Sequence, residues 1–180
     1  MNMAHSDKII RNNKTGQQIR FIQTSRDTNG QLLEMEATFR AGSVRPAAHY
    51  HPNQVEDFTV VAGQLTVQID GQTRTLGTGE TLHVSRNTVH AMWNGSENET
   101  IVNWQVRPAL DTESFFETVF ELSNEGKTAP DGMPPLLQRV LLAQHFSAVF
   151  RLAKPALVIQ RLVFSVLSPV ARLAGYRVFQ

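Results

Sequence analysis

The chain has no cysteine among its 180 residues, which excludes disulfide bonds and thiolate metal sites. Nothing in the composition therefore indicates an oxidising compartment. Residues 1–8 are polar and lack the apolar core of a signal peptide, so we expect a cytoplasmic protein. The length is sufficient for one domain with a sizeable hydrophobic core.

Net charge is also nearly absent, since 17 basic residues are balanced by 16 acidic ones. Such a chain is a poor ligand for nucleic acid, and we expect no nucleic-acid partner. Acidic residues are missing altogether near the end. Residues 132–180 hold six basic residues and no acid, whereas residues 1–131 hold 11 basic and all 16 acidic residues, a net charge of −5. The chain therefore divides near residues 128–132, a turn-rich linker.

Alternation of apolar and polar residues predicts a series of short strands in residues 1–110. The expected strands are 18–22, 33–39, 58–61, 64–69, 72–76, 81–84, 90–93 and 100–106. In the second of these, Leu33, Met35, Ala37 and Phe39 share one face, which should be buried. Seven or eight strands at this spacing fit an antiparallel β-barrel or jelly roll.

Helical patterns follow the predicted barrel. Residues 111–126 form one expected helix, with Asp111 as N-cap and Gly126 at its end. Residues 127–180 then form a basic, apolar helical extension. Its expected helices are 134–146 and 156–168, the second bounded by Pro155 and Pro169.

The helix 156–168 is apolar around most of its circumference and must be buried somewhere. The uncharged run that follows Arg161 in the sequence has only ten residues, 162–171, whereas a spanning helix needs about 18–20, so we exclude a membrane span. Packing on the barrel or in a dimer is the more ordinary outcome. Contact of residues 133–180 with an anionic membrane surface remains the alternative.

Three histidines and one glutamate, His49, His51, Glu56 and His90, form the candidate metal site. In an extended strand His49 and His51 project to the same side. Glu56 would then fall on the opposite face, but an irregular turn at Pro52 can reset the register. Any one of these residues alone would more often be a surface or hydrogen-bonded side chain. Together they are a ligand set that divalent metals accept, with coordination positions left for water or substrate.

The residues around these ligands resemble the two conserved motifs of the cupin superfamily. The first motif is matched by Gly42, His49, His51, Glu56 and Gly63. The second is matched by Gly77, Gly79, Glu80, His90 and Asn94, although Gly77 and Ser85 stand where prolines are common. The resemblance covers about residues 20–108.

The cupin resemblance implies an all-β, double-stranded β-helix (jelly-roll) barrel, here followed by C-terminal α-helices. It also implies a homodimer and a divalent transition metal, which could be Fe, Ni, Mn, Zn or Cu, bound by His49, His51, Glu56 and His90. A metal-dependent enzyme acting on a small organic molecule is then expected, most plausibly a quercetinase-like dioxygenase with Glu56 as catalytic base. Isomerases and decarboxylases share this ligand set. The alternative is a non-catalytic binding or sensing cupin whose C-terminal helices make a dimer or membrane-surface contact.

Several neighbours of the ligands are weaker candidates. Four apolar residues, for which core packing is the commoner role, could form a pocket wall: Phe58, Val60, Met92 and Trp104. Tyr50 and Gln54 could touch a substrate or point away from it. His83 could support the site or lie on the surface, and Asn94 is expected to stabilise a turn.

Overall fold

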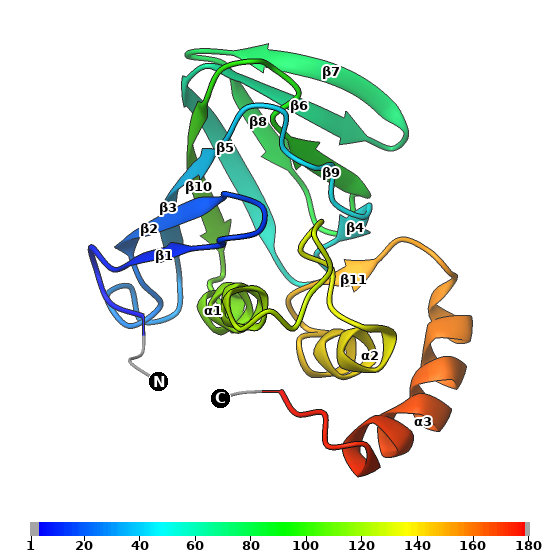
Figure 1. The fold of residues 1–180 in the computed structure, drawn as a ribbon. Helices are drawn as coiled ribbons and strands as arrows, with labels where there is room; N and C mark the ends of the chain where they lie inside the picture. The colour runs from blue at the N-terminus through cyan, green and yellow to red at the C-terminus, as the bar shows by residue number, and fades with distance from the viewer. Residues whose placement is uncertain (1–3, 179–180) are drawn as a thin grey trace.

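The computed structural model describes residues 4–178, in which two antiparallel sheets face each other above three helices (Figure 1). The strands are β1 (Ile9–Arg11), β2 (Gln18–Gln23), β3 (Leu33–Phe39), β4 (His49–Tyr50), β5 (Val55–Ala62), β6 (Gln64–Ile69), β7 (Gln72–Gly77), β8 (Thr81–Val84), β9 (His90–Trp93), β10 (Thr100–Arg107) and β11 (Arg151–Leu152). The helices are α1 (Thr112–Asn124), α2 (Leu136–His145) and α3 (Leu157–Leu173). The predicted jelly roll with C-terminal helices is therefore confirmed.

One sheet has the strand order β1-β2-β3-β10-β5-β8 and the other β11-β4-β9-β6-β7. Their inner faces form the hydrophobic core, because inward-facing apolar residues alternate with outward-facing ones along each strand. In β3 the four residues predicted to share a face, Leu33, Met35, Ala37 and Phe39, are all buried. Strands β3, β6, β8 and β9 have the predicted bounds, whereas the short β1, β4 and β11 were not predicted as strands.

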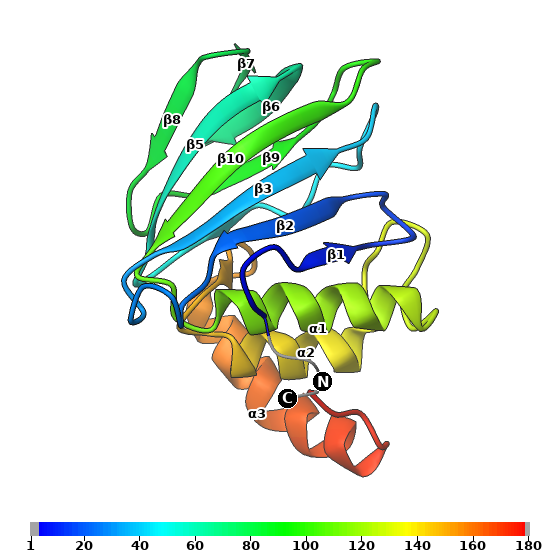
Figure 2. The same ribbon diagram turned by 90° about the vertical axis from the view of Figure 1, so that its left-hand side faces the viewer.

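Helix α1 lies beneath the sheet edge formed by β1 and β2 (Figure 2). Phe120 packs into the barrel core, and Lys8 forms an ion pair with Glu117 at 2.6 Å. Asp111 is the N-cap by position, but its side chain makes no capping hydrogen bond. Gly126 ends the helix as predicted, with a positive φ of 74° that suits glycine at this position.

Helix α2 packs against α1 and forms a second, smaller core. Its centre consists of Leu122, Leu142, Phe146 and Val149. The chain then returns to the barrel, where β11 pairs with β4 and so extends the second sheet by one strand. The C-terminal extension is thus hydrogen-bonded to the strand that carries His49.

Helix α3 continues beyond the predicted end at residue 168 and includes Pro169 within it. The prediction of a break at Pro169 was wrong. A proline removes one helical hydrogen bond, here to the carbonyl of Ser165. Both residues are exposed, so water can bond to that carbonyl and the helix can continue.

Candidate metal centre

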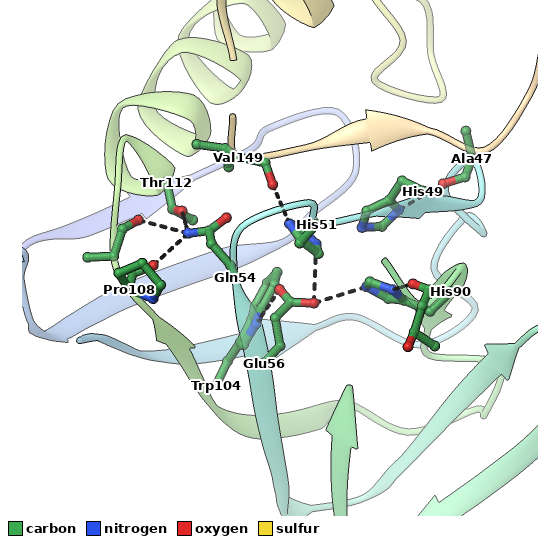
Figure 3. A network of polar contacts seen from close by, with 12 residues as sticks. Ala47, His49, His51, Gln54, Glu56, His90, Trp104, Pro108, Thr112 and Val149 are labelled. Carbon is green, nitrogen blue, oxygen red and sulfur yellow. Dashed lines mark hydrogen bonds and ion pairs between the residues drawn. The ribbon is translucent and has the colours of Figure 1, made fainter. Parts of the chain in front are cut away.

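Three strands bring His49, His51, Glu56 and His90 together at one end of the barrel (Figure 3). His49 in β4 pairs directly with His90 in β9. His51 follows β4, and the chain turns before β5 begins at Val55, so that Glu56 is buried and points inward. The expected change of register at Pro52 therefore occurs.

The four side chains converge closely. The ligand nitrogens of His49, His51 and His90 lie within 4.8 Å of one another, a spacing that could hold a metal ion. Oε2 of Glu56 lies 3.2 Å from Nε2 of His51 and 3.0 Å from Nε2 of His90. His51, Glu56 and His90 are buried, whereas His49 is only partly buried, so the site is most accessible beside His49.

Each imidazole is oriented by a backbone carbonyl on its Nδ1 side. His49 Nδ1 lies 3.0 Å from the Ala47 oxygen, His51 Nδ1 2.7 Å from that of Val149, and His90 Nδ1 2.9 Å from that of Thr88. A carbonyl can only accept a hydrogen bond, so Nδ1 carries the proton in each case. In the neutral imidazole Nε2 then has the free lone pair that a metal ligand needs.

This arrangement leaves acceptor atoms facing one another. Within residues 4–178, Nε2 of His51, Nε2 of His90 and Oε2 of Glu56 are buried without a conventional hydrogen-bond partner. The short distances between them become ion pairs only if an imidazole takes up a second proton. Buried acceptors without donors are costly, and a divalent cation among them would satisfy all three. The residues present therefore fit a metal ion.

The electrostatics of the cluster favour the ligand charge states of His49 and Glu56. Burial lowers the pKa of His49 to about 3, helped by the neighbouring His90 and His51. Burial also opposes ionisation of Glu56, but the facing His51 and His90 outweigh it and its pKa is lowered. The pKa of His51 is raised, because the attraction of Glu56 exceeds the cost of burial. Glu56 is thus a carboxylate and His49 is neutral at neutral pH.

Two groups that hold the cluster in place were not identified from the sequence. Trp104 was expected in the core or in a pocket wall, and its Nε1 also donates to Oε1 of Glu56 at 3.1 Å. Its inward position on β10, opposite Phe58 of β5, was the available signal. The Val149 carbonyl that accepts from His51 carried no signal, because a backbone group 98 positions away leaves none in the sequence.

The other weaker candidates from the sequence, Gln54 and His83 among them, make structural contacts within the protein. The amide of Gln54 is buried and donates to Pro108, Ala109 and Thr112, which fixes the start of α1. His83 is an exposed residue that contacts Asp57 at 2.7 Å, away from the cluster.

Asn94 bonds to the backbone of Phe39, Arg40 and Asn98, as expected of a turn residue. Phe58, Val60 and Met92 pack in the barrel core, and Tyr50 is partly buried.

Comparison with known proteins agrees with this geometry. Residues 35–105 match the family model described as Cupin domain. Quercetin 2,3-dioxygenase from Bacillus subtilis (strain 168) is 36% identical over 106 residues, which are 58% of this chain and 31% of that protein. The chain thus spans about a third of the length of this relative.

Two solved structures share the fold at a TM-score of 0.50. An RmlC-like cupin from Shewanella frigidimarina is 18% identical and covers 62% of this chain and 95% of its own. A predicted oxalate decarboxylase from Thermotoga maritima is 12% identical and covers 57% and 92%. Residues 35–105 thus form a cupin domain with a jelly-roll fold, which is followed in this chain by a C-terminal helical extension.

Proposed function

We propose that this cupin is a metal-dependent enzyme of the dioxygenase type acting on a small organic molecule. His49, His51, Glu56 and His90 would be the metal ligands, and iron, nickel, manganese, zinc and copper all suit this set. The observation that carries the proposal is the convergence of two imidazole nitrogens and one carboxylate oxygen, all buried and without donors. The partial similarity to quercetin 2,3-dioxygenase supports the type of reaction.

A bound metal would supply Lewis acidity and a place for substrate or dioxygen beside the ligands. The side chains of this protein would contribute proton transfer and the orientation of the substrate. Glu56, ionised at neutral pH, would be the catalytic base: on leaving the metal, its Oε2 would accept the proton of a substrate hydroxyl. Trp104 would keep Oε1 fixed during that transfer. The ring of Phe150, 5.6 Å from that of His49, would give the substrate an apolar contact at the accessible side.

The metal assignment is tested by elemental analysis of protein purified without a histidine tag and without added metal. We expect near-stoichiometric metal in the parent protein and in His83→Ala, because His83 lies outside the cluster. His51→Ala should lose the metal. If His51→Ala retains the parent's metal content, the ligand assignment is wrong.

The reaction is tested by oxygen consumption with a panel of flavonols and other enolisable substrates. The metal-loaded parent should consume oxygen and Glu56→Gln should not, with metal content measured in parallel. Metal binding without turnover of any substrate would contradict the dioxygenase assignment alone.

That result would favour a second candidate, a non-catalytic binding or sensing cupin that acts through its C-terminal helices. The observation in its favour is the exposed apolar surface of α3. A ligand that binds the metal-loaded protein with micromolar affinity and is recovered unchanged would support it.

A further inference from the structure

Helix α3 buries a side of mixed polarity, on which Phe164 and Leu167 are partly buried, and exposes a largely apolar side. Its buried residues are Gln160, Ser168 and Ala171. The Gln160 amide donates to the carbonyls of Leu152 and Pro155, and Ser168 donates to the side chain of Gln144. The opposite side of α3 is apolar and is not covered by any other described part of the chain. The expectation was packing on the barrel or in a dimer; the barrel does not cover this apolar surface, and packing in a dimer stays a prediction.

The exposed apolar residues form one continuous stripe. They are Val158, Ile159, Leu162, Val163, Val166, Val170 and Leu173. Three of them are exposed by more than two thirds: Val158 at 77%, Leu162 at 69% and Leu173 at 88%. Their spacing of three or four residues places them on one side of the helix. A surface of this kind marks a site of interaction.

Basic residues border the stripe. Arg161 follows Val158 by three positions, and Arg172 lies eleven residues further on, about three helical turns along the same side. Both are exposed, as are Lys154 and Arg177 at the two ends of the helix. Among residues 4–178, none of the ion pairs involves a basic residue beyond Lys127.

A hollow between α2 and the C-terminal end of α3 contains further basic side chains. It has a volume of about 390 Å³ and is lined by His145, Arg172, Tyr176 and Arg177 together with residues of α2. Arg172 thus belongs both to the edge of the apolar stripe and to the hollow. Two guanidinium groups beside an apolar surface match the arrangement of a lipid phosphate above its acyl chains.

The charges of the extension favour an anionic lipid surface over a second copy of α3 as its partner. Residues 132–180 contain no acidic residue, so a second copy of α3 would offer Arg161 and Arg172 no opposite charge. An anionic lipid surface offers both negative charge and an apolar layer. No helix among the described residues is long and apolar enough to cross a membrane.

We propose that α3 lies in the plane of an anionic membrane surface, with the Val158–Leu173 stripe in the acyl boundary and Arg161, Arg172 and Arg177 at the phosphates. This geometry is that of an interfacial amphipathic helix, in which apolar burial and electrostatic attraction both contribute to binding. The proposal does not depend on the reaction at the metal centre.

Vesicle co-sedimentation of the full chain tests the proposal. We expect binding to vesicles of phosphatidylcholine mixed with phosphatidylglycerol, little binding to phosphatidylcholine alone, and weaker binding at high salt. Replacing both Leu162 and Val166 by Asp should reduce the affinity at least about tenfold. Arg161→Gln and Arg172→Gln should each reduce it about fivefold.

Two variants on the barrel serve as matched controls. Val61→Asp changes an apolar residue that is 49% exposed on β5, and Arg74→Gln removes an exposed charge on β7. Neither should change vesicle binding. Equal sedimentation with and without phosphatidylglycerol, or no sedimentation at all, would overturn the proposal. So would an oligomer of the parent chain that the Leu162→Asp/Val166→Asp variant converts to monomer while vesicle binding stays unchanged, because the stripe would then be an interface between copies.

Discussion

His51 donates from Nδ1 to the carbonyl of Val149 at 2.7 Å, a bond between the barrel and the C-terminal extension. Hydrogen bonds of this kind fix the ring orientation and tautomer of metal-binding histidines. The segment after α2 thus contributes directly to the candidate metal centre. A second bond, from the Asn53 side chain to the carbonyl of Ala148 at 2.9 Å, ties the same two segments together.

Asn53→Ala should therefore lower metal affinity although Asn53 is no ligand. Loss of one hydrogen bond costs about 1 kcal/mol, which corresponds to about a fivefold weaker affinity if the Val149 carbonyl moves away from His51. Competition with a chromophoric chelator measures the change. Gln31→Ala, an exposed amide in the β2–β3 connection, is the control. Equal affinities of both variants and the parent would show that this contact does not support the site.

Trp104→Phe should also weaken metal binding, since it keeps an aromatic ring but removes the donor to Oε1 of Glu56. Loss of such a supporting bond lowers metal affinity by about 10–100-fold. The chain's other tryptophan, Trp93, provides a matched control, because its ring is contacted by Arg45 and not by the metal cluster. Metal titration of Trp93→Phe should give the parent's affinity. A similar loss in both variants would point to general loosening of the barrel.

The metal-free protein should lose stability as the pH falls below 6.5. The pKa of His49 is about 3 in the folded chain against 6.5 as the reference, so the unfolded chain binds a proton in this interval that the folded chain does not. The free energy of unfolding should then fall by up to about 1.4 kcal/mol per pH unit. His51, whose folded pKa is raised, is protonated in both states well below 6.5 and adds no slope there.

Urea titrations of the metal-free protein between pH 4.5 and 6.5 measure this dependence. Below 4.5, the reference value of Glu56, that residue adds its own acid-dependent loss because its folded pKa is lowered. Within the window, His49→Gln should flatten the curve. A slope that persists unchanged in His49→Gln would assign the proton uptake to another group.

Pro169→Ala should stabilise the extension. An interior proline costs a helix about 3 kcal/mol, partly offset because proline also restricts the unfolded chain. We expect a net gain of about 1–2 kcal/mol in the stability of α3, seen as slower amide hydrogen exchange in residues 160–173. Metal content should not change. Faster exchange would show that Pro169 sets a bend that the packing of α2 on α3 requires.

The sequence was sufficient for the barrel because its strands are long and alternate regularly, as in β3 and β10. It also identified the four clustered side chains, since the motif places His49, His51 and Glu56 within eight positions. The short strands β4 and β11 have two residues each, too few for any periodicity to appear.

The surroundings of the cluster could not be predicted for a different reason. The Val149 carbonyl acts through the backbone, and every residue type has the same carbonyl group. The orientation of α3 could not be predicted from its apolar pattern either. The pattern shows that the helix has an apolar stripe but not whether the stripe faces the protein or the solvent. The sequence signal was the pair Gln160 and Ser168, two polar residues on the side of the helix that makes the internal contacts.

Gln160 has a mechanical consequence as well. Its amide donates a hydrogen bond from the first turns of α3 to the carbonyl of Leu152. Leu152 in turn pairs with His49 between strands β11 and β4. Only one hydrogen bond and one strand pair therefore separate α3 from the metal cluster. Whatever holds α3 would also fix the tilt of the barrel and the direction in which the side of the cluster beside His49 faces. Docking through this helix would orient the molecule as well as anchor it.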